Sequence, residues 1–335
     1  MRSFTRLTGL VTAGLAAFAL TACGTDSPSA TESSQAATAE ASADASWPRT
    51  VTDEKGEVTL DAQPEKIVST SISVTGTLLA INAPVVASAA TSVSDITDDK
   101  GFFSQWADVA DERGVDVLYD NLEFSMEALI AADPDLVIVS TSGADSVLDH
   151  YDEISAQFPT LVVDYSKQTW QDLATELGEA TGHEADAAQA ISDFDDYAAT
   201  AAQSITVPEG GVSIASYNGP GADQGIAKKT GPHAQLMNEL GIDVVEAPAD
   251  LDTSEQERSD FAFVTFENLS QAIGGDAVFL LSGTEETVQA FESQSVLANL
   301  PAVQSGSVYP LGPTSFRIDY YSGKQFIDAV VDALS

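Results

Sequence analysis

The sequence predicts an α/β protein in which two βα lobes, each with a mainly parallel sheet, are joined by one long helix. Three observations predict this fold. Short apolar segments alternate with helical segments in the first half of the 335-residue chain. The same alternation restarts at residue 212, and between the halves apolar residues recur at helical spacing over residues 169–203. Continuous apolar strands are typical of a parallel sheet that is covered by helices.

The first lobe is predicted to span residues 47–166. Its strands are short and apolar, and Lys55-Gly56 forms the turn between the first two. The predicted strands are a pair within 51–60 and single strands at 67–69, 85–89, 134–139 and 161–163; the predicted helices are 75–81, 123–131 and 146–158. Alternation of this kind indicates a sheet with crossover helices.

The linking helix is predicted to span residues 167–204. Apolar side chains recur at helical spacing from Trp170 to Tyr197, with one interruption at residues 181–183. A helix of this length would extend about 50 Å, which is longer than a small domain. It would therefore join the two lobes as a rigid connection.

The second lobe is predicted to span residues 205–335. Its predicted strands are 212–217, 244–245, 277–281 and 308–309, and its predicted helices are 234–240, 266–273, 285–291 and 320–334. The two halves share one order of features, in which a helix containing Glu is followed by Asp and an apolar strand. Glu123 precedes Asp135 in the first half, and Glu267 precedes Asp276 in the second.

The N-terminal segment predicts a bacterial lipoprotein signal peptide over residues 1–22. Arg2 and Arg6 precede an apolar run from residue 7 to 20, and small residues lead to Cys23, the only cysteine. The run is shorter than the roughly 20 residues that cross a membrane. We expect lipidation of Cys23 and attachment to the extracytoplasmic face of the cell membrane; the alternative is an ordinary cleavable signal with a chance cysteine. Residues 23–46 are predicted to be a disordered linker, because they lack large apolar residues.

Composition excludes several classes of function. The chain carries 52 acidic and 13 basic residues, a net charge of −39, which repels nucleic acid and anionic lipid. A single cysteine cannot form an intrachain disulfide. The three histidines, His150, His183 and His233, are far apart, which argues against a metal site. No nucleophile motif or nucleotide-binding loop is present, which argues against an enzyme, and we expect no cofactor.

Several motifs in order carry a family resemblance. They are DDKGFFSQW at 98–106, WQDLATELGEATGHE at 170–184, LPAVQ at 300–304 and SFRIDYYS at 315–322, of which the last is the most specific. Over residues 47–335 the chain resembles the extracytoplasmic substrate-binding proteins of ABC importers for ferric siderophores, haem and cobalamin that have a single long linking helix. Within this class it is most similar to the ferric-enterobactin-binding proteins.

The resemblance implies a cleft that binds a bulky ferric chelate through cations and aromatic walls. A tris-catecholate complex is an anion with flat aromatic faces, and arginine both donates hydrogen bonds and stacks on rings. Arg317 matches a cleft position of the family; the alternative is a surface arginine paired with Asp319. Lys228 and Lys229 follow a strand of the second lobe and are further candidates, with a solvated loop as the alternative.

The corresponding loop of the first lobe contains Lys100, Phe103 and Trp106, which are also predicted to contact the ligand. Relatives have arginines in this loop that are absent here, so a siderophore with fewer catechols or mixed donors remains open. Three tyrosines are further candidates for the cleft wall, with burial in the core as the alternative: Tyr119, Tyr165 and Tyr217.

The resemblance also implies docking onto a permease. Glu123 and Glu267 match the family positions that contact permease arginines, although a carboxylate at a helix start is also favoured by the helix dipole. We therefore expect a lipid-anchored monomer that captures a ferric siderophore and delivers it to an ABC permease without making or breaking a bond. The alternatives are a haem- or corrinoid-binding protein of this class, a surface-tethered enzyme and a surface interaction module.

Overall fold

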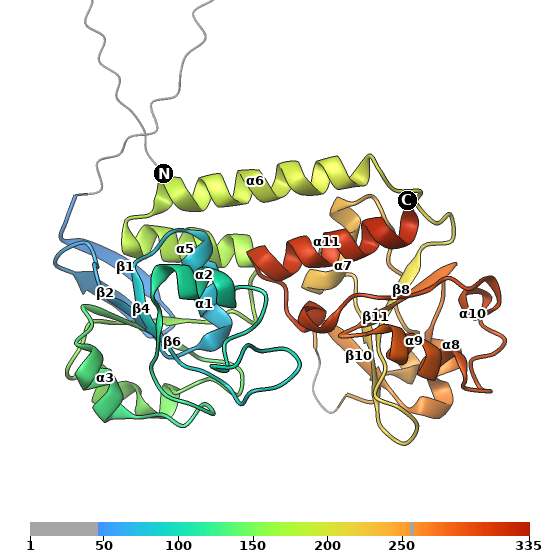
Figure 1. Cartoon of the computed structure of the whole chain (residues 1–335), viewed down its shortest axis with the longest axis horizontal. Helices are drawn as coiled ribbons and strands as arrows, with labels where there is room; N and C mark the ends of the chain where they lie inside the picture. Colours follow the sequence, from blue (N-terminus) through green and yellow to red (C-terminus); the bar gives the residue numbers. More distant parts are fainter. Residues whose placement is uncertain (1–45, 255–257) are drawn as a thin grey trace, which may run out of the picture. The chain divides into compact units, whose positions relative to one another are not determined.

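The computed structural model describes residues 46–254 and 258–335. The predicted signal peptide, Cys23 and all of the predicted linker except Ser46 lie outside these residues. Within the described part, no helix combines the length and the apolar composition that crossing a membrane requires. Three sheets lie in this part: a two-stranded sheet near its start and two five-stranded sheets, one in each half of the sequence (Figure 1).

The first lobe contains a five-stranded sheet in which every neighbouring pair is parallel. In spatial order its strands are β5 (Asp116–Val117), β4 (Val85–Ser88), β3 (Ile67–Ser69), β6 (Leu136–Ser140) and β7 (Thr160–Val163). β6 is buried along its whole length, as expected for a central strand covered on both faces. The predicted apolar strands are confirmed, and the two-residue β5 was not predicted.

The helices of the first lobe connect these strands. They are α1 (Ile72–Ala80), α2 (Ala107–Arg113), α3 (Met126–Ala132), the 3-10 helix η1 (Leu148–His150) and α4 (Tyr151–Ser155). α3 begins after Glu123 because Ser125 caps it, accepting a hydrogen bond of 3.2 Å from the backbone N of Ala128. The prediction that Glu123 opens this helix is therefore wrong.

An antiparallel hairpin, β1 (Arg49–Asp53) and β2 (Gly56–Leu60), lies beside the edge strand β7. The backbone N of Glu54 donates to the carbonyl of Val162 over 3.0 Å, and the Val162 N donates to the Asp53 carboxylate over 2.8 Å. The predicted strand pair around Lys55-Gly56 is confirmed, and it continues the hydrogen bonding of the sheet edge.

The second lobe contains a mixed sheet. In spatial order its strands are β10 (Phe261–Val264), β9 (Gln224–Ala227), β8 (Val212–Ser216), β11 (Ala277–Leu281) and β12 (Val308–Pro310). β8, β11 and β12 are parallel, whereas β9 is antiparallel to both of its neighbours. The mainly parallel sheet is confirmed. β9 and β10 were not predicted, and the predicted strand at 244–245 makes only a single bridge, between Val244 and Val212.

The helices of the second lobe are mostly short. They are α7 (Pro232–Glu239), η2 (Ala249–Leu251), η3 (Phe266–Asn268), α8 (Leu269–Ala272), α9 (Glu285–Glu292), α10 (Pro301–Ser305), η4 (Pro313–Phe316) and α11 (Tyr320–Leu334). α11 has its predicted bounds. Asp319 caps it, because its carboxylate accepts hydrogen bonds of 2.8 Å from the backbone N of both Tyr321 and Ser322.

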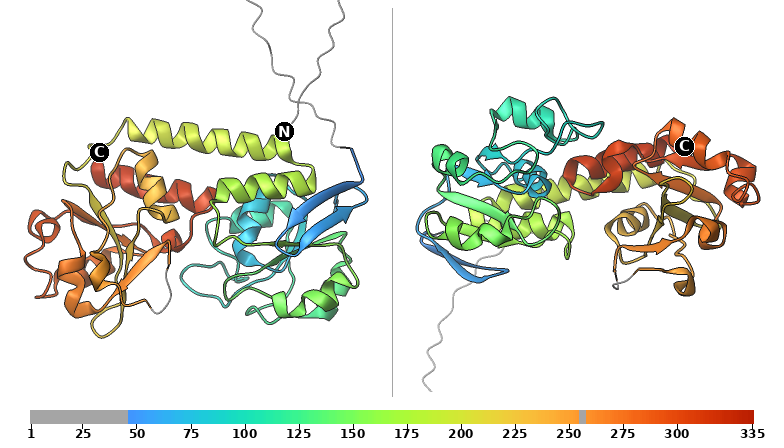
Figure 2. Two further views of the ribbon diagram at one scale, coloured as in Figure 1. Left: turned by 180° about the vertical axis from the view of Figure 1, so that it is seen from behind. Right: turned by 90° about the horizontal axis from the view of Figure 1, so that it is seen from below.

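The prediction of one linking helix of about 50 Å is wrong. The segment forms two helices, α5 (Trp170–Thr181) and α6 (Glu184–Ala202), and the chain reverses between them at Gly182, whose φ is +75°. The two helices pack side by side, and α6 alone passes from the first lobe to the second (Figures 1 and 2). At 1.5 Å per residue α6 extends about 28 Å.

One apolar core extends through both lobes along these helices. It joins residues of α1, α5 and α6 to residues of α11 and of the second sheet. Trp170 of α5 packs edge-on against Phe194 of α6 and Tyr320 of α11, with ring centroids 5.0 and 5.6 Å apart. Helices α5, α6 and α11 therefore connect the two lobes along one side of the molecule (Figure 1).

Candidate functional site

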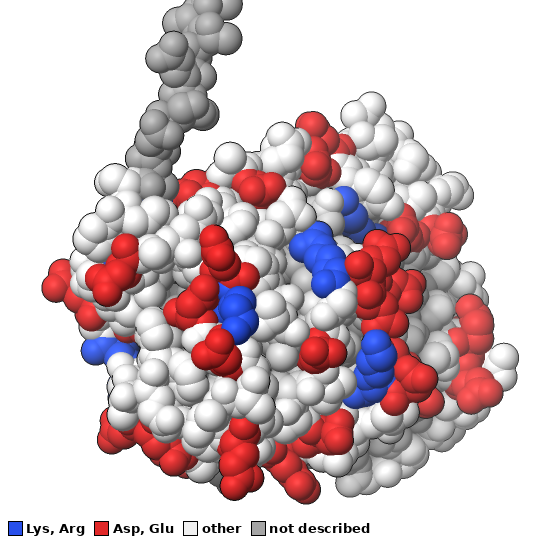
Figure 3. All heavy atoms as spheres, turned by 60° about the vertical axis from the view of Figure 1, so that its left-hand side comes forward, with Lys and Arg blue, Asp and Glu red and all other residues white. Residues whose placement is uncertain are grey.

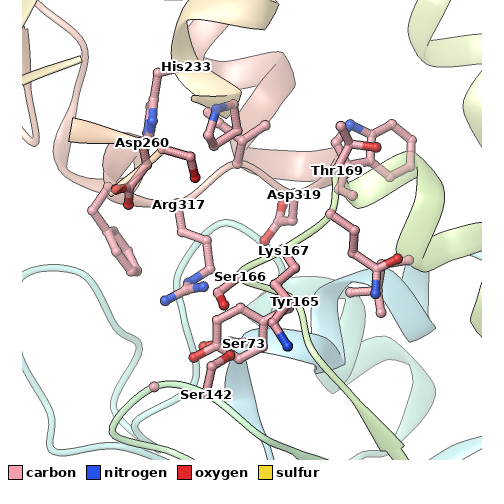
Figure 4. A pocket seen from close by; sticks show the side chains of 18 of the residues that line it. Ser73, Ser142, Tyr165, Ser166, Lys167, Thr169, His233, Asp260, Arg317 and Asp319 are labelled. Carbon is pink, nitrogen blue, oxygen red and sulfur yellow. The ribbon is translucent and has the colours of Figure 1, made fainter. Parts of the chain in front are cut away.

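A cavity of about 670 Å³ lies between the two lobes, beside the ends of several strands (Figure 4). The first lobe contributes α1 and the loops that follow β6 and β7; the second contributes the start of α7, the segment before β10 and the segment before α11. Its polar lining residues are Ser73, Thr77, Ser142, Ser166, Lys167, Gln168, Thr169, His233, Arg258, Ser259, Asp260, Arg317 and Asp319. Tyr165, Trp170, Phe261 and Phe316 supply aromatic surface.

Arg317 reaches from the second lobe toward the first. Its backbone is extended between η4 and α11, and its guanidinium carbon lies 4.3 Å from the centroid of the Tyr165 ring (Figure 4). Among the described residues no carboxylate lies within 4.0 Å of its nitrogens, and its buried Nε has no hydrogen-bond partner. The arrangement leaves a positive charge and N–H donors facing the cavity, which suits an anionic ligand.

Two other cations line the cavity, and each has an acidic partner. Lys167 Nζ lies 2.8 Å from Asp164 and 3.6 Å from Glu54. Arg258 donates two hydrogen bonds to Asp260, of 2.9 and 2.7 Å. Figure 3 shows the same pattern on one face of the molecule, where the few Lys and Arg side chains lie beside Asp or Glu.

The pairing between Lys167 and Asp164 shifts the pKa of both groups toward their charged forms. Burial opposes ionisation of Asp164, but hydrogen bonds from Lys167 and Ser166 outweigh it and hold the Asp164 pKa below its usual range. The hydrogen bond with Asp164 in turn raises the pKa of Lys167. Both groups are therefore charged at neutral pH, and each offsets the field of the other in the cavity.

Two buried polar residues form the second-lobe side. His233 is 3% exposed, its Nε2 donates to the Ser315 carbonyl over 2.8 Å, and burial lowers its pKa to about 4. It is therefore neutral at pH 7. Asp319 accepts a hydrogen bond of 3.1 Å from Gln105 in addition to its capping bonds, and burial raises its pKa. Asp319 does not pair with Arg317, so the alternative of a surface ion pair between them is not observed.

The structure places the predicted basic pair outside the cavity lining. Lys228 Nζ lies 2.9 Å from Asp252 and donates to the Arg258 carbonyl. Lys229 Nζ lies 2.8 Å from Asp243. Neither lines the cavity, and each is instead paired with a carboxylate of its own lobe. This corrects the expectation that the pair faces the ligand.

The predicted residues in the loop of the first lobe also do not contribute to the cavity lining. Trp106 and Phe103 are 1% and 7% exposed and belong to the core, where Phe103 packs edge-on against Phe316 with centroids 5.2 Å apart. Lys100 pairs with Asp111 on the surface. These three residues do not line the cavity in this structure, which corrects that expectation.

Of the three tyrosines considered for the wall, only Tyr165 lines the cavity. Tyr119 is buried, and its hydroxyl donates to the Thr70 carbonyl over 3.1 Å. Tyr217 packs edge-on against Phe291, with centroids 5.4 Å apart. The core alternative therefore describes Tyr119, whereas Tyr217 is only partly buried and lies outside the cavity lining.

Glu123 and Glu267 are both exposed. Glu123 lies in the loop before α3, and Glu267 lies in η3. Neither contributes to the cavity, and their role in docking stays a prediction. Within residues 46–254 and 258–335, no group of three or more His, Cys, Asp or Glu side chains is arranged to hold a metal ion.

The sequence interpretation did not single out Lys167, Arg258 or the Trp170 side chain as ligand contacts. Lys167 lies in the loop after β7 and Trp170 begins α5 at the end of that loop. Loops at the carboxyl ends of parallel strands form binding sites, so the position of both residues was an available signal. Arg258 precedes β10, a strand that the sequence did not predict.

Comparison with known proteins agrees with this architecture. The sequence profile of the periplasmic binding proteins matches residues 67–314. The ferric enterobactin-binding periplasmic protein FepB of Escherichia coli O6:H1 is 42% identical over 287 residues, which are 85% of this chain and 90% of that protein.

Solved structures share the fold. Holo-ViuP superposes with a TM-score of 0.79 at 38% identity, covering 87% of this chain and 96% of that one. Staphylococcus aureus SirA, solved in complex with staphyloferrin B, superposes with a TM-score of 0.65 at 17% identity, covering 85% and 98% of the two chains. This chain belongs to the periplasmic binding protein family.

Proposed function

We propose that this protein captures a ferric siderophore of the catecholate type outside the cytoplasmic membrane and delivers it to an ABC importer. The observation that carries the proposal is Arg317, a cation without an acidic partner among the described residues that faces a cavity between two lobes. The relative named as a ferric enterobactin-binding protein, at 42% identity, supports the same ligand class.

The cavity suits such a ligand in size and chemistry. Its volume of about 670 Å³ lies in the range of small-molecule sites. A ferric catecholate presents anionic oxygens and flat rings; Arg317 donates to the oxygens, and Tyr165, Trp170, Phe261 and Phe316 supply surface for the rings. Iron arrives already chelated, so the protein needs no resident cofactor and makes or breaks no bond.

The number of cations without a carboxylate partner determines how much negative charge on a siderophore the cavity can neutralise. Lys167 and Arg258 each have a carboxylate partner, which leaves Arg317 to meet the ligand charge. A mixed-donor ferric complex carries less negative charge than a tris-catecholate and needs fewer cations. Both kinds of complex therefore belong in the binding test.

The proposal includes where the protein works. Lipidation of Cys23 would hold a monomer on the extracytoplasmic face of the cell membrane, and the linker after it would let the lobes reach ligand and permease. The exposed carboxylates of Glu123 and Glu267, one in each half of the chain, are the proposed contacts with permease arginines.

Tryptophan fluorescence tests the proposal directly. Trp170 lines the cavity, whereas Trp47 and Trp106 do not. Ferric enterobactin or a mixed-donor ferric catecholate should quench the mature protein at micromolar concentration or below, and Trp170→Phe should remove more of the quenching than Trp47→Phe. Quenching by haem alone, or by none of the three, would contradict the proposal. Release of a chemically altered ligand, detected by mass spectrometry, would favour an enzyme instead.

A further inference from the structure

Asp145 is a buried carboxylate beside the cavity that no lysine, arginine or histidine of the described residues neutralises within 4.0 Å. It is 5% exposed. One oxygen accepts hydrogen bonds from Ser71 Oγ over 2.6 Å and from the Ser73 backbone N over 2.9 Å. The other accepts from the Tyr165 hydroxyl over 2.8 Å. Burying an unpaired charge is costly, so this carboxylate calls for a reason beyond packing.

The contact between Asp145 and Tyr165 depends on Gly143. Its φ is +87°, and a Cβ built on it would lie 1.7 Å from the Tyr165 hydroxyl oxygen and 2.5 Å from Oδ1 of Asp145. Any side chain at this position would displace one of the two groups. The loop after β6 thus contributes both Asp145, which accepts the hydrogen bond from Tyr165, and Gly143, whose lack of a side chain leaves room for this contact.

Tyr165 in turn supports Arg317. The ring receives the guanidinium on its face at 4.3 Å, and the ring comes from the first lobe while the arginine comes from the second (Figure 4). A phenol that donates to a carboxylate has a more electron-rich ring, which strengthens its attraction for a cation. The hydrogen bond also fixes the ring plane, so the guanidinium is held in one place before any ligand arrives.

We propose that Asp145 is a positioning residue for ligand binding, which acts through Tyr165 to hold the Arg317 guanidinium toward the cavity. The effect on affinity rests on the proposed function, in which Arg317 meets an anionic ferric complex. The effect on Arg317 itself does not depend on which ligand binds.

A double-mutant cycle tests the route through Arg317. Tyr165→Phe removes the hydrogen bond to Asp145 and keeps the ring, and Gly143→Ala forces the two groups apart. Each should weaken binding of ferric enterobactin about fivefold in the wild-type background and less than about twofold in an Arg317→Met background. Equal losses in both backgrounds, or no loss in the first, would overturn the proposal.

Gly221→Ala is the matched control for Gly143→Ala. Gly221 has φ +88°, and a Cβ built on it meets nothing within 4 Å, so the substitution imposes the same backbone penalty without displacing a neighbour. It should leave the affinity unchanged. A loss equal to that of Gly143→Ala would assign the effect to backbone strain and would overturn the proposal.

A measurement on the ligand-free protein separates this proposal from the proposed function. The side-chain Nε–H resonance of Arg317, assigned by its loss in Arg317→Lys, should carry an upfield ring-current shift from Tyr165. Asp145→Asn and Gly143→Ala should reduce this shift, whereas Gly221→Ala should not. An unchanged shift in both Asp145→Asn and Gly143→Ala would overturn the role of Asp145, whatever ligand binds. A reduced shift in a protein that does not bind ferric enterobactin would contradict the proposed ligand but not the role of Asp145.

Discussion

The side-chain amide of Gln105, in the first lobe, donates a hydrogen bond of 3.1 Å to the carboxylate of Asp319, which caps the last helix of the second lobe. The contact lies against Gly76 of α1, where a built Cβ would fall 3.0 Å from Asp319 Oδ2 and 2.8 Å from the Trp106 ring. The two lobes thus meet through the buried hydrogen bond between Gln105 and Asp319, and this close packing is possible because Gly76 has no side chain.

Gly76→Ala should therefore destabilise the protein. In an exposed helix interior, alanine in place of glycine stabilises by up to about 1 kcal/mol. Here the clash with Trp106 and Asp319 should reverse the sign and cost about 1–3 kcal/mol. Urea unfolding measures the difference, and an increase in the free energy of unfolding would show that the lobes do not pack this closely.

Protonation of His233 should make the protein less stable as the pH falls. Burial lowers its pKa to about 4 in the folded state from the usual 6.5, so between these values the unfolded chain binds more protons. The free energy of unfolding should fall by up to about 3 kcal/mol from this group as the pH drops from 6.5 to 4.

Denaturant unfolding at a series of pH values isolates that contribution. His233→Gln keeps a donor for the Ser315 carbonyl and removes the titration, so its pH dependence should be shallower than that of the wild type. His150 lies on the surface, and His150→Gln serves as the control. Equal slopes for the wild type and His233→Gln would contradict the buried, neutral state of this histidine.

Lys229 and Lys100 should be dispensable for ligand binding. Each lies outside the cavity lining and pairs with a surface carboxylate, Asp243 and Asp111 respectively. Exposed pairs of this kind contribute little to stability, so the alanine variants should also fold normally. Titration with ferric enterobactin should give affinities within about twofold of the wild type; a larger loss in either variant would place that lysine in the binding site.

Charge reversal at Glu123 and Glu267 should separate uptake from binding. Both carboxylates are exposed and lie outside the cavity, so arginine at these positions should leave ligand affinity unchanged while repelling the proposed permease arginines. Iron uptake by cells that carry the double variant should be lost. Normal uptake would remove the two residues from the docking surface, and lost binding would show a structural role.

The sequence was sufficient for elements with strong periodicity and clear boundaries. α11 has its predicted bounds because Asp319 is a strong cap and Phe326, Ile327 and Val330 form one buried face. The apolar strand β11 was predicted with its bounds for the same reason. β9 was missed because its few residues lie among glycines, which are typical of loops.

The linking segment shows where periodicity fails. Apolar spacing continues across Gly182 because α5 and α6 both pack against the same core. The spacing of apolar residues indicates which face of a helix is buried, but it does not indicate the direction of the chain. The reversal at Gly182 was therefore not visible in the spacing. Gly182 lies in the left-handed region, the usual end of a helix.

The site was only partly predictable because its geometry is set by pairs that are distant in the sequence. Lys229 is neutralised by Asp243 from another loop, and Trp106 is buried in the core, where it packs against Phe102 and Phe103. Arg317 was identified from its motif, but its contact with Tyr165 joins residues from opposite halves of the chain. Residue types alone do not reveal which charges have partners.

The affinity of Arg317→Met for ferric enterobactin tests the central claim most directly. Methionine keeps an apolar stem against Tyr165 and removes the charge and the N–H donors, so the Kd measured by fluorescence titration should rise at least about tenfold, which corresponds to one strong charge-assisted contact. The unfolding midpoint should stay near that of the wild type, since Arg317 has no ion-pair partner in the described residues. An unchanged Kd would show that this cavity does not bind the ferric complex through Arg317.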